Sequence, residues 1–206
     1  MDPVKDIKIL KREYPDAKYY LNFSTPMDLV VATILSAQCR DTIVNATTKS
    51  LFARYRTAKD FAKLKDSEVS GITFFMAKAE NIRKTAKIID EKYKGMVPQS
   101  LDELTQLPGI GRKTAHAILQ NAFGIVDGIV IDTHGIRVSY RLGWTKNKTP
   151  EKIETDLMKS VPKQYWKDLP HLVKAHGRAV CMAPVPKCGT CVLQKTCPRQ
   201  GVVKSS

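Results

Sequence analysis

Apolar residues recur at intervals of three and four positions through nearly the whole chain, which is the period of an α-helix. No run of alternating polar and apolar residues is long enough to form a sheet. The chain is therefore predicted to be all-α. The pattern is sharpest in one helix predicted after residue 111, whose apolar positions are Ala115, Ile118, Leu119, Ala122 and Phe123.

Glycine and proline mark a tight hairpin before that helix. The segment Leu107 to Ala115 reads LPGIGRKTA, so one helix stops at Pro108 and the next begins after Gly111 and closes at Gly124. Glycine lets the backbone turn sharply. We expect a helix, a hairpin and a second helix whose first N–H groups point outward and can bind a phosphate oxygen.

The hairpin resembles a nucleotide-binding Walker A loop only superficially. That motif has four residues between its first glycine and its Gly-Lys pair, whereas a single residue separates Gly109 from Gly111. The third glycine of a dinucleotide-binding fingerprint is also missing. The sequence therefore disfavours nucleotide binding.

The chain of 206 residues carries 34 Lys and Arg against 20 Asp and Glu, a formal net charge of +14 that favours a polyanionic partner. Its longest apolar stretches, Leu29 to Leu35 and Ile125 to Ile131, are far shorter than the roughly 18 to 20 residues that span a bilayer. The first residues show no secretion signal. We expect a cytoplasmic protein with no membrane partner.

Four of the five cysteines crowd into 17 residues near the C-terminal end, at Cys181, Cys188, Cys191 and Cys197. Four thiolates can hold either zinc or an iron–sulfur cluster. Structural zinc sites usually present two close pairs of ligands, but here only the middle two cysteines form a close pair. A metal site is predicted; the fifth cysteine, Cys39, is expected to be an ordinary buried thiol.

Lys113 lies in the first turn of the helix after the hairpin and has two interpretations. It is a phosphate contact beside Arg112, or it is a nucleophile, because the positive end of a helix disfavours the charged form of an amine. Asp132 stands 19 residues downstream at another helix start. It is either the N-cap of that helix or a carboxylate that transfers protons and stabilises positive charge on a sugar.

A further helix is predicted between Ser67 and Lys94, where basic residues alternate with apolar ones. We interpret these basic residues as a solvated helix face. They are Lys78, Arg83, Lys84 and Lys87.

Four separated motifs together resemble the endonuclease III family of helix-hairpin-helix DNA glycosylases. They are Leu35 to Gln38, Leu107 to Ala115, Ile131 to His134 and the cysteine spacing, and they occur in that order. The resemblance covers roughly Pro26 to Pro198. Because four independent motifs agree, the resemblance is specific.

The resemblance implies two domains. Residues 22–125 would form a six-helix barrel domain that contains the hairpin. Residues 1–21 and 126–206 would form a discontinuous helical domain, in which the four cysteines hold one 4Fe-4S iron–sulfur cluster.

The resemblance also implies a function in base excision repair, as a bifunctional DNA glycosylase and abasic-site (AP) lyase that removes oxidised pyrimidines from duplex DNA. Lys113 would displace the damaged base by attacking the sugar, and the resulting Schiff base would undergo β-elimination, assisted by Asp132. The expected partner is double-stranded DNA containing damaged pyrimidines or abasic sites. We expect a monomer associated with the nucleoid.

Several DNA contacts follow from the same resemblance. Gln38 matches the residue that fills the gap left by a flipped base. Phe74 matches an apolar wedge that enters the duplex, with core packing as the alternative. The backbone of the DNA is expected to meet Gly109, Gly111, Arg112 and Lys187.

This chain departs from the family pattern in three ways: the loop from Met182 to Lys187 is less basic than in many family members, and two single residues differ. Thr73 stands where a glycine usually precedes the wedge, and His116 stands where asparagine is common. Two other functions stay open: a monofunctional mismatch glycosylase of the same superfamily, which the lysine disfavours, and a DNA-binding module without catalysis, which predicts salt-sensitive binding and no base release.

Overall fold

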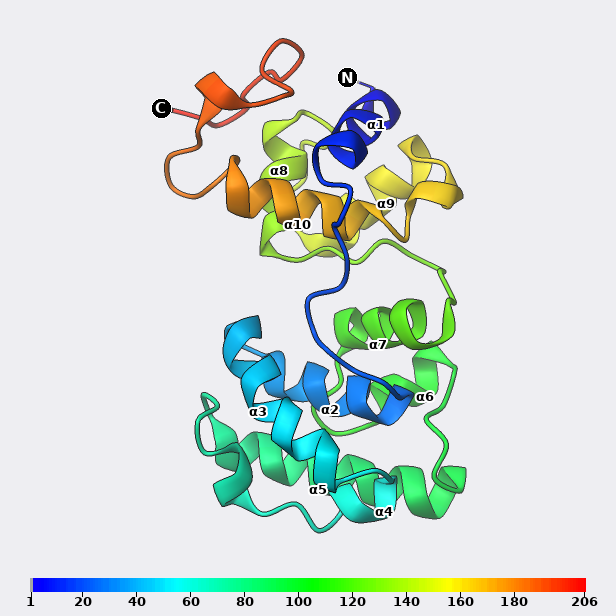
Figure 1. Ribbon diagram of the computed structural model, residues 1–206. Helices are drawn as coiled ribbons and strands as arrows, with labels where there is room; N and C mark the ends of the chain where they lie inside the picture. The colour runs from blue at the N-terminus through cyan, green and yellow to red at the C-terminus, as the bar shows by residue number, and fades with distance from the viewer. Residues whose placement is uncertain (1) are drawn as a thin grey trace. The chain divides into compact units, whose positions relative to one another are not determined.

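The computed structural model describes residues 2–206, and this part of the chain contains helices, turns and loops but no strand (Figure 1). The prediction of an all-α fold is confirmed. The described residues form two compact units: a central unit of residues 19–125 and a terminal unit of residues 2–18 with 126–206. Each unit has its own hydrophobic cluster. Among the described helices, none is long and apolar enough to cross a membrane.

The central unit is organised around α2 (Pro26–Ser36), which packs against α3, α5 and α7 (Figure 1). Every residue from Met27 to Leu35 is buried, so α2 is covered by other elements on all sides. The other elements of this unit are α3 (Asp41–Arg54), α4 (Ala58–Phe61), the 3-10 turn η1 (Asp66–Val69), α5 (Phe75–Tyr93), α6 (Leu101–Thr105), α7 (Arg112–Ile118) and the π-helical turn η2 (Leu119–Phe123).

Helix α2 begins with a capping box. The hydroxyl of Thr25 accepts a hydrogen bond from the Asp28 N–H at 3.1 Å, and the Asp28 carboxylate accepts one from the Thr25 N–H at 3.0 Å. Helix α3 has Arg40 as its N-cap. The Arg40 carbonyl accepts the first helical hydrogen bonds, and its side chain makes no capping bond.

The predicted helix-hairpin-helix is confirmed as α6, the turn after it, and α7. The helix expected to run without interruption to Gly124 changes at Leu119 into a π-helical turn, in which the Gly124 N–H donates to the Leu119 carbonyl. Gly124 then adopts a φ of 71°, which ends the helix as predicted.

The terminal unit joins segments from both ends of the chain: α1 (Pro3–Glu13), α8 (Thr133–Arg141), α9 (Pro150–Ser160), η3 (Lys163–Tyr165), α10 (Leu169–Ala179) and η4 (Cys188–Thr190). Helix α10 packs on both α8 and α1. The buried carboxylate of Asp6 on α1 accepts a hydrogen bond from Trp144 Nε1 at 2.9 Å. Burial raises the pKa of Asp6, and the hydrogen bond from Trp144 opposes that shift.

Helices α8 and α10 approach each other closely at Gly177. A β-carbon at this position would lie 2.7 Å from His134 Nδ1 and 3.2 Å from Val138 Cγ2. The Gly177 carbonyl also accepts a hydrogen bond from Arg137 Nη2 at 2.9 Å. The packing of these two helices therefore requires glycine here.

We expect Gly177→Ala to lower the free energy of unfolding by about 1–3 kcal/mol, because the added methyl group forces α8 and α10 apart. Urea unfolding followed by circular dichroism measures the change. Gly71→Ala is the matched control, since a β-carbon at Gly71 meets no atom within 4 Å. Equal stability of the two variants would contradict the close packing at Gly177.

Candidate active site and cysteine cluster

Helix α5 supports the hairpin between α6 and α7. Gly109 has a φ of 81°, and a β-carbon there would lie 3.1 Å from Asn81 Nδ2. Both observations require glycine. The hydroxyl of Thr85, also on α5, donates to the Pro108 carbonyl at 2.9 Å. The hairpin is therefore held in place before any ligand binds.

The start of α7 presents free backbone donors and two cationic side chains. Gly111 is the N-cap and has no side chain to occupy the first N–H groups of the helix. Arg112 and Lys113 are the first two helical residues, and both are exposed. Among the described residues, neither side chain has a hydrogen-bond or ion-pair partner. This arrangement suits a phosphate or sugar ligand.

Asp132 is the N-cap of α8. Its Oδ1 accepts a hydrogen bond from the Gly135 N–H at 2.8 Å, so the capping interpretation is confirmed. Capping occupies one carboxylate oxygen and fixes the rotamer. Within residues 2–206, the other oxygen accepts no hydrogen bond, so the half-buried side chain keeps an acceptor for a ligand. Lys113 belongs to the central unit and Asp132 to the terminal unit.

Within the first turns of α8, His134 and Arg137 form a hydrogen-bonded pair. Arg137 Nη2 lies 3.1 Å from His134 Nδ1. Because a guanidinium only donates, Nδ1 is the acceptor and the ring proton is on Nε2. Burial lowers the pKa of His134, and the nearby Asp132 carboxylate opposes this shift.

Two arginines on α8 hold the loop that follows the first cysteine. Arg137 Nε donates to the Cys181 carbonyl at 3.0 Å, and Arg141 Nη1 donates to the Met182 carbonyl at 2.7 Å. A second nitrogen of Arg141 reaches the Pro184 carbonyl at 3.3 Å. Sequence reasoning missed both arginines, although their spacing of four residues after a helix cap places them on one face.

The four clustered cysteines line one small cavity in the terminal unit. The Leu193 N–H donates to Cys191 Sγ at 3.4 Å, and the Arg199 N–H donates to Cys197 Sγ at 3.3 Å. Burial raises the pKa of both thiols. Within residues 2–206, no three His, Cys, Asp or Glu side chains are arranged to hold a single metal ion.

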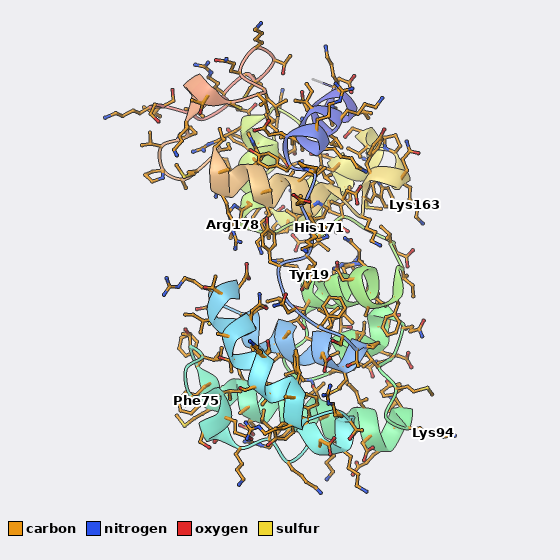
Figure 2. The ribbon with its side chains drawn as sticks, in the orientation of Figure 1. Tyr19, Phe75, Lys94, Lys163, His171 and Arg178 are labelled. Carbon is orange, nitrogen blue, oxygen red and sulfur yellow. The ribbon has the colours of Figure 1, made fainter. Side chains whose placement is uncertain are left out.

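Gln38 and Phe74 lie at exposed turns with left-handed backbone, with φ of 51° and 57°. Gln38 follows α2 by two residues, and Phe74 is the N-cap of α5. The side chain of Phe74 is 65% exposed, so the core-packing alternative is wrong. The adjacent Phe75 packs against the core instead; it marks the start of α5 in Figure 2, and Lys94 marks the end.

The basic residues of α5 do not form one solvated face. Lys84 and Lys87 are exposed, as predicted, and each also pairs with a glutamate one turn away. Arg83 is half-buried and donates to the Leu64 carbonyl at 3.0 Å. Lys78 is only 6% exposed, so the solvated interpretation is wrong for this residue.

Lys187 lies directly before η4 and its side chain is exposed, as a phosphate contact requires. The fifth cysteine, Cys39, is half-buried against the core of the central unit. It lies outside the cysteine cavity.

Comparison with known proteins assigns this chain to a family. Residues 31–163 match the HhH-GPD superfamily base excision DNA repair protein. Endonuclease III of Synechocystis sp. is 46% identical over 194 residues, which cover 92% of this chain and 89% of the relative. The chain belongs to the endonuclease III family of helix-hairpin-helix DNA glycosylases. The resemblance noted in the sequence is confirmed.

Two solved structures of endonuclease III are similar to this chain in fold. One is a non-covalent complex with DNA, 37% identical, with a TM-score of 0.89 and coverage of 95% of this chain and 94% of that one. The other is a trapped covalent intermediate with DNA, 38% identical, with a TM-score of 0.87 and coverage of 94% and 92%.

The cysteine cavity of this chain fits an iron–sulfur cluster by the chemistry of its donors. Four thiols line it together with the imidazole of His176, and backbone N–H groups already donate to two of the sulfurs. Such N–H groups offset the negative charge of cluster-bound thiolates. The side chains present are therefore compatible with the iron–sulfur cluster that the family resemblance implied.

Because Asp132 caps α8, we expect its alanine and asparagine variants to differ in their free energy of unfolding. We expect Asp132→Ala to lower the free energy of unfolding by about 1 kcal/mol, because the Gly135 N–H loses its acceptor. Asp132→Asn keeps an acceptor and should stay within about 0.5 kcal/mol of the natural protein. Urea unfolding measures both; equal losses in the two variants would show that capping is not what Asp132 contributes.

Proposed function

We propose that this chain is a bifunctional DNA glycosylase and AP lyase of base excision repair, acting on oxidised pyrimidines in duplex DNA. The observation that carries the proposal is the exposed lysine at the start of α7 in an endonuclease III chain. A covalent protein–DNA intermediate has been trapped in a relative that is 38% identical over 94% of this chain. A reaction of that kind requires a nucleophile, and Lys113 is accessible.

In this proposal the Nζ of Lys113 attacks C1′ of the damaged nucleotide. The N–C1′ bond forms while the base departs with the electron pair of its glycosidic bond. Ring opening gives a protonated Schiff base between Lys113 and C1′. Loss of a C2′ proton then breaks the C3′–O bond, and this β-elimination cuts the strand.

Asp132 supplies the negative charge for the same reaction. A carboxylate stabilises positive charge that develops on the sugar and accepts the proton that the attacking amine must lose. Its hydrogen bond to the Gly135 N–H fixes the side chain without neutralising it. N-capping and catalysis are therefore compatible roles of one residue.

The proposed DNA contacts divide into two kinds. The hairpin glycines Gly109 and Gly111, with Arg112 and Lys187, bind phosphates and carry no sequence information. Gln38 and Phe74 occupy the space that opens when the target nucleotide leaves the stack. Their exposure at the tips of two turns supports this assignment.

We also assign the two domains: residues 22–125 as the six-helix barrel domain, and residues 1–21 with 126–206 as the cluster domain. Cys181, Cys188, Cys191 and Cys197 would hold one 4Fe-4S cluster, which supplies a one-electron redox group when bound. The partner is duplex DNA with damaged pyrimidines or abasic sites. We propose a monomer that works in the cytoplasm on the nucleoid.

Borohydride trapping tests the nucleophile. We expect the natural protein to form a covalent adduct with duplex DNA containing an abasic site, and Lys113→Gln to form none, because the Schiff base requires the amine. Arg112→Gln should still form the adduct at reduced yield. Denaturing gel electrophoresis reads the result, and an adduct in Lys113→Gln would show that another residue is the nucleophile.

A second assay, of base release and strand cleavage on a duplex with one oxidised pyrimidine, separates the other functions. Base release that leaves an uncut abasic strand would identify a monofunctional glycosylase, and salt-sensitive binding without base release would identify a binding module.

Asp132→Asn, which retains the helix cap, should release base at least about a hundredfold more slowly if the charge participates in the reaction.

The metal group has a simple optical test. A protein purified under nitrogen should be yellow-brown, with broad absorption near about 400 nm and about four iron and four sulfide per chain. Cys191→Ser should lose most of this absorption. A colourless protein that contains zinc would contradict the cluster assignment.

A further inference from the structure

The buried ammonium of Lys78 lies at the end of α2. Its Nζ donates to the Leu35 carbonyl at 2.8 Å and to the Ala37 carbonyl at 2.5 Å. The side chain comes from the first turn of α5, the end that Phe75 marks in Figure 2. Lys78 therefore connects two helices through main-chain acceptors, one of them directly before Gln38.

The end of α2 compensates for the cost of burying this charge. The last carbonyls of a helix have no partners within it and form the negative end of its dipole. Among the described residues, no carboxylate lies within ion-pair distance of Lys78. Burial lowers the pKa of Lys78, and the neighbouring Cys39 thiol opposes the shift. The contacts to the Leu35 and Ala37 carbonyls thus carry the interaction.

Lys78 also lies one turn after Phe74, where its backbone makes the first helical hydrogen bond of α5, as any residue except proline would. Its backbone N–H donates to the Phe74 carbonyl at 3.2 Å. Gln38 and Phe74 both have positive φ, a region that side chains other than glycine adopt only when their surroundings enforce it. Lys78 is thus hydrogen-bonded to both turns: to Ala37 beside Gln38, and to Phe74 itself.

We propose that Lys78 is a positioning residue that fixes the turns of Gln38 and Phe74 relative to each other, so that both side chains are in place when a nucleotide leaves the duplex. The inference rests on the proposed function, in which these two side chains enter the DNA. Lys78 acts through them and does not itself touch the substrate.

This role predicts a loss that depends on the substrate. Extruding a nucleotide from a duplex costs free energy, which prearranged side chains help to offset. An abasic site in single-stranded DNA requires no base pair to open, so its cleavage depends on Lys113 but not on Gln38 and Phe74. Helix α7, which carries Lys113, also packs on α2, so general damage to the core would slow both reactions.

The experiment compares Lys78→Met with Lys87→Met under single-turnover conditions. Both variants replace a lysine of α5 by methionine, but Lys87 is exposed. Each is assayed on a duplex with one oxidised pyrimidine and on a single strand with one abasic site. Fluorescence of 2-aminopurine beside the lesion reports unstacking of the duplex, and circular dichroism reports folding.

We expect Lys78→Met to slow cleavage of the duplex at least about tenfold, the equivalent of one unmade buried hydrogen bond, with a matching loss of the fluorescence change. Its rate on the single strand should stay within about twofold, and Lys87→Met should match the natural protein on both substrates. Equal slowing on both substrates, or an unchanged rate on the duplex, would overturn the proposal.

Lys78→Arg provides a second test that does not depend on the methionine variant folding. It keeps a buried cation, but the side chain of arginine is longer and its donors lie in one plane, so they reach the Leu35 and Ala37 carbonyls with a different geometry from the ammonium. We expect an intermediate rate on the duplex and a normal rate on the single strand. If the duplex and single-strand rates of Lys78→Arg fall equally, Lys78 has only a structural role.

Gln38→Ala and Phe74→Ala separate failure of this inference from failure of the proposed function. If both variants cleave duplex normally, the proposed DNA contacts are wrong and Lys78 has nothing to position. If both lose activity on duplex while Lys78→Met keeps it, the contacts stand and the role of Lys78 is wrong. An inactive natural protein would refute the proposed function itself.

Discussion

Every α-helix leaves backbone N–H groups at its start and carbonyl groups at its end without partners inside the helix. In this all-helical chain, those ends carry the side chains proposed to act on DNA: Gln38, Phe74, Lys113 and Asp132. The Asp132 carboxylate caps the start of α8, and the Lys78 ammonium caps the end of α2. The start of α7 has no side-chain cap, because Gly111 has no side chain, and its N–H groups stay available for phosphate.

Features that depend on local sequence could be predicted. The helices could be predicted because apolar residues recur every three to four positions along each of them. The hairpin could be predicted because glycine and proline mark the turn. The crowding of four cysteines likewise indicated a shared site, and all four line one cavity. Helix boundaries were less predictable: Arg40 is the N-cap of α3 although its side chain makes no capping hydrogen bond, so no side-chain signal marks the start of this helix.

Features that depend on packing between elements could not be predicted. Lys78, Lys84 and Lys87 are the same residue type on one helix, but only Lys78 faces the end of α2. Phe74 and Phe75 are adjacent and chemically identical. The left-handed backbone at the first sends its side chain into solvent while the second packs on the core. The residue pattern of α5 does not show where α2 packs on it, so the burial of Lys78 could not be predicted.

The buried ammonium of Lys78 is better explained by conformational specificity than by stability. Removing a cation from water is costly, and apolar residues of similar volume often stabilise a core equally well. What a methionine cannot provide is a set of directed donors that select one arrangement of the Leu35 and Ala37 carbonyls. Because Ala37 precedes Gln38 and the same lysine's N–H binds the Phe74 carbonyl, that selection sets two turns at once. A residue with this bonding pattern fixes the backbone of the two turns, whose side chains are the ones proposed to enter the duplex.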